Sequence, residues 1–189
     1  MAKASPENRW VNTDDSQTPA ILAKAQHILE DTLYGTLATS SPDGVPWASP
    51  IFFGYDAAWN LYWASAQGAQ HSQHLYANQG RAAITIYSTD RQEGKGQGLY
   101  LVGIATEVDR TEIEGVLPFF LRRAAPGQRR TPADYLDPSP RRLYGFQPQT
   151  VWITGERLAL SDTILVDTKI QLDLPRLIAA TGNPQSLID

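Results

Sequence analysis

The sequence predicts a mostly β protein, a closed antiparallel barrel of about six short strands with helices added around it. Three observations predict this class. Short runs rich in β-branched and aromatic residues recur between turn residues from residue 33 onward. A hairpin-length connection over residues 56–60 joins two of these runs and is too short for the crossover of a parallel sheet. The 189 residues suit one domain, and 42% apolar residues suffice to bury a core.

The N-terminal region predicts a tail followed by a helix. Residues 1–17 are polar and aperiodic, so we expect a tail before a single domain that spans residues 18–189. Thr18 can cap the helix, and Pro19 suits its first position. The helix carries an apolar stripe at helical spacing, formed by Ile21, Leu22, Ala25, Ile28, Leu29 and Leu33.

The predicted strands follow in order along the chain. A Ser-Pro-Asp-Gly turn at residues 41–44 separates the first two, and a short helix over residues 69–78 follows the third. A loop rich in Gly and Gln, residues 90–98, precedes the fifth. The five strands span residues 33–39, 45–55, 61–65, 81–87 and 99–108.

The last third of the chain predicts two helices and more strands. Asp109 or Thr111 can cap a helix that runs to about residue 125 and is kinked at Pro118. Residues 126–142 are rich in Pro and Arg and predict an irregular connection. The remaining predicted elements are strands over 142–146, 151–154 and 164–172, and a helix over 175–181 that Gly182 ends.

Composition excludes several classes of function. The chain has no cysteine, which excludes disulfides, thiol nucleophiles and cysteine-bound metal clusters. A net charge of −4 argues against general nucleic-acid binding. The sequence contains no apolar run of the roughly 20 residues that a membrane span needs, and its start lacks the apolar stretch of a signal peptide. We therefore expect a cytoplasmic protein that binds no membrane.

Residue types alone indicate no catalytic group. His71 and His74 share a helix face, but a third ligand is missing, so no metal site is predicted. No Gly-x-Ser-x-Gly motif supports serine hydrolysis, and the glycines of residues 94–98 lack the spacing of a P-loop. Six of the twelve arginines lie in one stretch, and they indicate either a solvated face or an anion site: Arg122, Arg123, Arg129, Arg130, Arg141 and Arg142.

A series of motifs from residue 33 to residue 108 resembles the pyridoxamine 5'-phosphate oxidase-like family of FMN-binding split barrels. The motifs are Gly35-Thr-Leu-Ala-Thr39, Pro42-Asp-Gly-Val-Pro46, Ser49-Pro-Ile-Phe-Phe-Gly-Tyr-Asp56, Leu61-Tyr-Trp-Ala-Ser65, Gly68-Ala-Gln-His-Ser-Gln-His-Leu75, Asn78-Gln-Gly-Arg-Ala-Ala-Ile84 and Leu101-Val-Gly-Ile-Ala-Thr-Glu-Val108. A weaker match follows at Tyr144-Gly-Phe-Gln-Pro148, Val151-Trp152 and Gly155-Glu-Arg-Leu158. The resemblance implies a six-stranded antiparallel split β-barrel with flanking helices. It also implies a homodimer with FMN in a cleft between the subunits.

The resemblance also implies a set of cofactor-binding residues. Phosphate contacts are expected from the helix after the third strand, and ring and ribityl contacts from the strands; Trp152 is expected to cover one face of the ring. The set comprises Ser49, Pro50, Ile51, Phe52, Trp63, Ala64, Ser65, Gln70, His71, Ser72, Gln97 and Trp152. Arg157 matches a substrate-binding arginine of the family.

The chain departs from the family pattern at its charged positions. Ala48 and Phe53 stand where the family strand has Arg and Lys, so His71, if protonated, would replace a lost cation. Ala159 stands in place of a substrate-binding histidine. We therefore expect an FMN-dependent oxidoreductase that does not oxidise pyridoxamine phosphate itself.

Two alternatives remain open at the level of sequence. One is a barrel without catalysis that binds a ligand or a partner. The other is a protein that binds haem, with His71 or His74 as iron ligand, or a deazaflavin. The substrate and the electron donor or acceptor are not indicated.

Overall fold

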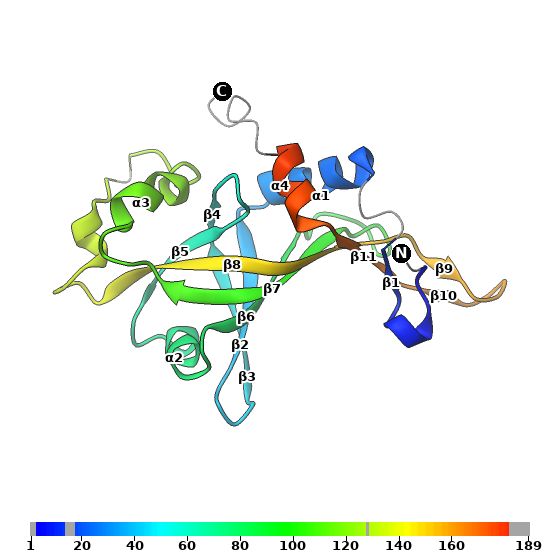
Figure 1. Cartoon of the computed structure of the whole chain (residues 1–189), viewed down its shortest axis with the longest axis horizontal. Coiled ribbons are helices and arrows are strands. Elements are labelled where there is room, and N and C mark those ends of the chain that lie inside the picture. The colour runs from blue at the N-terminus through cyan, green and yellow to red at the C-terminus, as the bar shows by residue number, and fades with distance from the viewer. Residues whose placement is uncertain (1–2, 14–17, 128, 182–189) are drawn as a thin grey trace. The chain divides into compact units, whose positions relative to one another are not determined.

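The computed structural model describes residues 3–13, 18–127 and 129–181, which form mostly strands with a few helices (Figure 1). The chain divides into two compact units. The central unit comprises residues 33–84 and 102–149, and the terminal unit comprises 1–32, 85–101 and 150–189. Three strands run from one unit into the other: β6 (Arg81–Tyr87), β7 (Gly98–Glu107) and β8 (Arg141–Thr154).

The central unit begins with a hairpin of β2 (Tyr34–Ser40) and β3 (Pro46–Phe52). The two strands are antiparallel, with Tyr34 opposite Phe52. Gly44, in the predicted turn, has φ of +89°, a conformation that glycine adopts without steric cost. The strand order in this unit is β8-β7-β6-β2-β3, so β3 ends the order.

A second hairpin joins β4 (Gly54–Tyr55) to β5 (Leu61–Ala66). The carboxylate of Asp56 holds its turn, because Oδ1 accepts hydrogen bonds of 2.9 Å from the backbone N–H groups of Ala58 and Asn60. β5 also pairs with β8 in antiparallel register, which sets Trp63 opposite Tyr144.

Two helices pack on the strands of the central unit. Helix α2 (Gln70–Ala77) packs on β2, and α3 (Ile113–Leu121) packs on β4 and β5. A side chain at Gly54 would place a Cβ 2.2 Å from the carbonyl oxygen of Phe119, so glycine is what allows α3 to approach β4. Helix α3 contains Pro118 and ends at Leu121, earlier than the predicted residue 125.

The core of the central unit lies between α3 and the strands. Its buried side chains come from β5, α3, the short helix η2 (Pro132–Tyr135) and β8. The cluster consists of Tyr62, Ile113, Leu117, Phe120, Tyr135 and Leu143. The helix η2 lies within residues 126–142, for which an irregular connection is predicted.

The terminal unit joins both ends of the chain. Helices α1 (Pro19–Asp31) and α4 (Leu174–Thr181) lie side by side (Figure 1). β11 (Lys169–Leu172) pairs antiparallel with β8, and β1 (Val11–Asn12) pairs parallel with β11. Two short strands form a separate sheet, β9 (Leu158–Ala159) and β10 (Leu165–Val166). The helix η1 (Pro6–Asn8) and β1 lie in the stretch predicted as a tail.

The prediction of a mostly β protein with added helices is confirmed, but the structure differs from a closed barrel of six antiparallel strands, because the strand order of the described sheet runs from β1 to β3 without closing. The described residues form a nine-stranded sheet, and β1–β11 is a parallel pair. One reason is that the predicted strand 45–55 is divided into β3 and β4, although the predicted strands 142–146 and 151–154 form a single strand, β8. Another is that the predicted tail contributes β1. Gly182, the predicted helix stop, lies outside the described residues. No helix in the described part of the chain has the length and apolar character of a membrane span.

Candidate functional site

A cavity of about 630 Å³ opens in the central unit between β3, β5, α2 and the segment after α3. A volume of this size suits a small-molecule ligand or cofactor. Seven of the residues predicted for cofactor binding line it: Pro50, Ile51, Phe52, Trp63, Ala64, Ser65 and His71. We call it the His71 cavity. The central unit therefore brings together most of the predicted set.

His71 is held between two serines. Its Nδ1 lies 3.1 Å from Ser49 Oγ, and its Nε2 lies 2.7 Å from Ser65 Oγ. Ser49 Oγ also accepts a hydrogen bond of 2.9 Å from Trp47 Nε1, which leaves the serine hydroxyl free to donate to the imidazole. This arrangement fixes the ring and turns Ser49, a predicted contact, into a support for His71.

The charge of His71 is set by its surroundings. Burial lowers the pKa of the His71 imidazole below its usual value, and the neighbouring His74 lowers it further. A lowered pKa makes the neutral form dominant at pH 7. His71 then offers a hydrogen-bonding group to a ligand, and its lowered pKa disfavours the protonated form that would replace a lost cation.

The other predicted residues of α2 point elsewhere. Gln70 is exposed and contacts His74 through their Nε2 atoms at 2.6 Å, and His74 contacts Thr39 Oγ1 at 3.2 Å. Ser72 is fully buried away from the cavity lining. Only His71 of the three predicted phosphate contacts on α2 lines the cavity, because successive helix positions face different directions.

Trp63 forms part of the cavity wall and is 1% exposed. Its ring stacks on Tyr144. Its Nε1 is buried and has no hydrogen-bond partner within the described residues. A buried N–H without a partner costs free energy.

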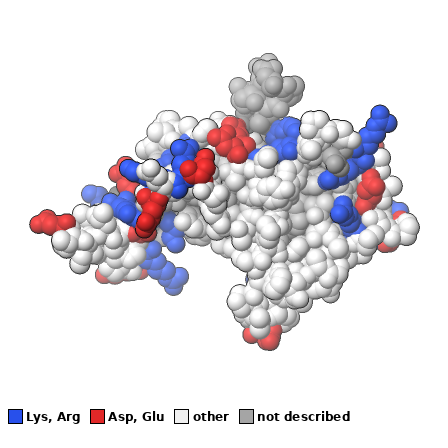
Figure 2. All heavy atoms as spheres, turned by 180° about the vertical axis from the view of Figure 1, so that it is seen from behind, with Lys and Arg blue, Asp and Glu red and all other residues white. Residues whose placement is uncertain are grey.

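Arginines form the remaining side of the His71 cavity. Arg123, Arg130 and Arg141 line it, and none of the described lining residues is Asp or Glu. Figure 2 shows Lys and Arg side chains, with Asp and Glu side chains beside them, at the right of its view, where α3 and the segment after it lie. The cavity is therefore electropositive, and an anionic ligand fits its chemistry. The sequence showed the arginine cluster, but not which members would face the cavity.

Arg142 has a different role from Arg141. Its side chain is 7% exposed, its Nε lies 2.9 Å from Glu107 Oε1, and it also pairs with Asp137. Successive residues of a strand face opposite sides, so Arg142 faces this ion pair while Arg141 faces the cavity.

The sequence profile of the pyridoxamine 5'-phosphate oxidase family matches residues 21–155. The chain belongs to the pyridoxamine 5'-phosphate oxidase family. The family predicted from the motifs of residues 33–108 is thereby confirmed. No curated protein matches the chain in sequence.

Solved structures share the fold of this family member at low sequence identity. A heme binding protein from Mycobacterium smegmatis has a TM-score of 0.60 at 22% identity over 86% of this chain. A protein of unknown function from Agrobacterium tumefaciens has a TM-score of 0.62 at 20% identity over 82% of this chain and 64% of its own. The heme storage protein HutZ from Vibrio cholerae has a TM-score of 0.50 at 16% identity over 68% of this chain and 91% of its own. The chain spans 60% of the Mycobacterium smegmatis protein.

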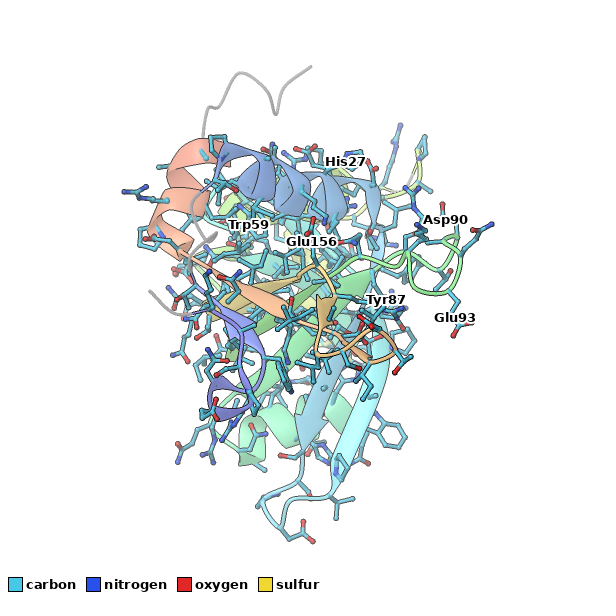
Figure 3. All side chains as sticks on the ribbon, turned by 90° about the vertical axis from the view of Figure 1, so that its right-hand side faces the viewer. His27, Trp59, Tyr87, Asp90, Glu93 and Glu156 are labelled. Atoms are coloured by element: carbon cyan, nitrogen blue, oxygen red, sulfur yellow. The ribbon has the colours of Figure 1, made fainter. Side chains whose placement is uncertain are left out.

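A second cavity of this pyridoxamine 5'-phosphate oxidase family member lies in the terminal unit and measures about 890 Å³. Gln97 and Arg157 line it, together with Tyr87 and Glu156, which Figure 3 labels. Gln97 Oε1 is buried without a hydrogen-bond partner within the described residues, so we call this the Gln97 cavity. Arg157 Nε pairs with Asp167 Oδ1 at 2.8 Å. The two residues thus lie in the other unit from the His71 cavity.

Trp152 lies outside both cavities, and the histidines of α2 form no metal site with the other described residues. Trp152 lies on β8 opposite Gln171 of β11 and lines neither cavity. Across the described ranges, no three His, Asp or Glu side chains lie close enough together to hold a metal ion. His71 and His74 face different neighbours, Ser49 and Thr39.

Proposed function

We propose that this protein binds FMN in the His71 cavity and is an FMN-dependent oxidoreductase. The observation that carries the proposal is the composition of this cavity. It joins seven residues that the family resemblance assigns to the cofactor with three arginines and no carboxylate. FMN has an aromatic ring system and a phosphate of about two negative charges, and the cavity offers aromatic walls and cations for both.

The residues present fit such a cofactor. Phe52 and Phe120 pack edge to face with centroids 5.6 Å apart and give the cavity an apolar wall. β3 ends the strand order, so its outer edge can offer backbone donors and acceptors to a ring. The apolar wall excludes water, and His71 and Ser65 hold polar groups in fixed positions.

When bound, FMN supplies hydride transfer at its N5 atom, and the protein supplies orientation, electrostatics and the exclusion of water. His71 stays neutral at pH 7 and is oriented from both sides by serines. Because Ala159 stands at the family histidine position and is exposed, the proposal excludes pyridoxamine phosphate as the substrate.

The proposal is tested by the visible spectrum of the purified protein and by an FMN titration. We expect a flavin spectrum, or saturable FMN binding that raises Tm. Ala64→Phe fills the cavity without a change of charge and should abolish binding, whereas Ala77→Phe, on the exposed side of α2, should not. A protein that gains neither flavin nor stability at high FMN refutes the proposal, and a Soret band would favour the haem alternative.

The oxidoreductase part of the proposal has its own test. The FMN-loaded protein is mixed without oxygen with NADH, NADPH or a reduced deazaflavin, and flavin bleaching is followed. Bleaching by one donor supports the enzyme. Tight FMN binding with no reduction by any of these donors would favour a ligand-binding protein without catalysis.

We further propose that the protein is a cytoplasmic homodimer. Two large apolar side chains at the turn end of the β2–β3 hairpin are exposed, Val45 at 58% and Trp47 at 48%. Exposed apolar patches of this kind support a protein–protein contact. A cytoplasmic location fits a protein that draws on soluble flavin and nicotinamide cofactors, and cell fractionation would test it.

A further inference from the structure

We propose that Arg123, Arg130 and Arg141 form the phosphate anchor of the His71 cavity and replace the basic residues that this chain lacks on β3 and α2. This inference rests on the proposed function, because it names the residues that bind the anionic end of the cofactor. Three guanidinium groups line the cavity, and none of its described lining residues is a carboxylate. Guanidinium groups match phosphate in geometry and charge.

Arg123 lies next to a position where a cation is missing. Phe53 stands where the family strand has Lys. The guanidinium carbon of Arg123 lies 4.9 Å from the centre of the Phe53 ring and 5.2 Å from that of Tyr55. Aromatic faces attract and orient a guanidinium group. The segment after α3 therefore places a positive charge beside Phe53, where β3 carries none.

Arg130 and Arg141 reach the same cavity from either side of η2. The guanidinium carbon of Arg130 lies 5.6 Å from the centre of the Phe120 ring, on the apolar wall. Arg141 begins β8 and lies opposite Ala66, next to the Ser65–Arg142 pair. Its neighbour Arg142 forms ion pairs with Glu107 and Asp137. Of these two arginines, Arg141 is therefore the one that can bind a ligand.

The other polar groups of the cavity cannot supply the charge. His71 is neutral at pH 7 for the reasons given above, and Ser65 carries no charge. Phosphate binding in a partly enclosed cavity needs charge-assisted donors. The three arginines are the cations of the described lining, so they carry this role.

The experiment compares FMN with riboflavin, which has the same ring but no phosphate. In Arg123→Gln and Arg130→Gln, FMN affinity should fall at least about tenfold, the loss expected for a hydrogen bond to a charged group, while riboflavin affinity stays unchanged. Arg123→Lys should restore part of the loss. Arg129→Gln is the matched control, because Arg129 belongs to the same stretch, is exposed and does not line the cavity. Equal losses for both flavins would overturn the anchor.

A second arm separates this inference from the proposed function. The Tm of wild type and variants is measured with inorganic phosphate at constant ionic strength. A rise in wild type that is lost in Arg123→Gln and kept in Arg129→Gln supports the anion site even if neither flavin binds. If phosphate stabilises wild type and Arg123→Gln equally, or stabilises neither, the inference is wrong, whatever the flavin titration gives.

Discussion

The indole ring of Trp63 stacks on the phenol ring of Tyr144, with centroids 5.7 Å apart and planes inclined by 16°. The two residues are opposite each other on β5 and β8. Both side chains are almost fully buried. Trp63 also lines the His71 cavity, so one stacked pair joins the core of the central unit to the proposed site.

Truncation of this pair should destabilise the fold. We expect Trp63→Ala to lower the free energy of unfolding by about 3 kcal/mol, because it removes a large buried ring and leaves a cavity. Urea unfolding followed by circular dichroism measures the loss. Trp47→Ala, at a position 48% exposed, is the control and should cost about 1 kcal/mol or less. A similar loss for both variants would contradict the assigned burial of Trp63.

Tyr76 should ionise only at high pH. Burial raises the pKa of the Tyr76 phenol, and hydrogen bonds to Tyr144 (2.7 Å) and Glu107 (2.8 Å) raise it further. A pKa raised above the unfolded value, about 10, means that its contribution to stability is complete below that pH and is lost as the pH rises toward the folded pKa. Tyr76→Phe should therefore flatten the alkaline fall of stability. Ultraviolet titration and urea unfolding between neutral pH and high pH would show it.

His71 should make stability depend on pH on the acid side. Burial first, and His74 second, lower the pKa of its imidazole. A lowered pKa gives a contribution that is present above the unfolded value, about 6.5, and is lost as the pH falls toward the folded pKa. His71→Gln should reduce the loss of stability below that value. His27→Gln, on the exposed face of α1, is the control, and NMR titration of the imidazole protons checks the assignment.

Neighbouring arginines on β8 should behave differently. Arg142→Ala removes a buried guanidinium group and leaves Glu107 without its arginine partner, and should destabilise the protein by about 3 kcal/mol. Arg141→Ala changes an exposed side chain and should cost about 0.5 kcal/mol or less, but it should weaken FMN binding. Thermal unfolding and flavin titration of the two variants give opposite rankings if this division of roles is right.

The oligomeric state should respond to the β2–β3 hairpin. In sedimentation velocity we expect a dimer for the wild type and a shift toward monomer for Trp47→Ser combined with Val45→Ser. Both side chains are exposed, so the loss of apolar contact affects association more than folding. A dimer that persists in the double variant would contradict an interface on the β2–β3 hairpin.

Strand positions were predicted well because their signals are local. The pattern of β-branched and aromatic residues gave β6 at residues 81–87 without error, and the other early strands within a few residues. β1 was missed because its two residues, Val11 and Asn12, form a strand only by pairing with β11, more than a hundred residues away in the sequence. Such pairing leaves no periodic signal in the sequence.

The candidate site was predicted in part. The motifs placed β3 and β5 residues at one cavity, since short strands in sequence order pair predictably. Which residues of α2 line the cavity was not predictable, because that depends on how the helix packs on β2. Of the three predicted phosphate contacts on α2, His71 lines the cavity, and Gln70 and Ser72 do not. To predict which arginine lines the cavity, the register of β8 must be known to within one residue. A shift by one residue would exchange the faces on which Arg141 and Arg142 lie.

Gly54 does not line the His71 cavity, but it sets how closely α3 approaches β4 and so affects the shape of the cavity. A single methyl group there would meet the backbone of Phe119 and Phe120 and force α3 away from β4. Phe120 and Arg123 would move with the helix, and both line the cavity. A substitution buried under α3 could thus retune which ligands are admitted while every ligand-contacting residue stays the same, so the ligand preferences of related chains cannot be read from their contact residues alone.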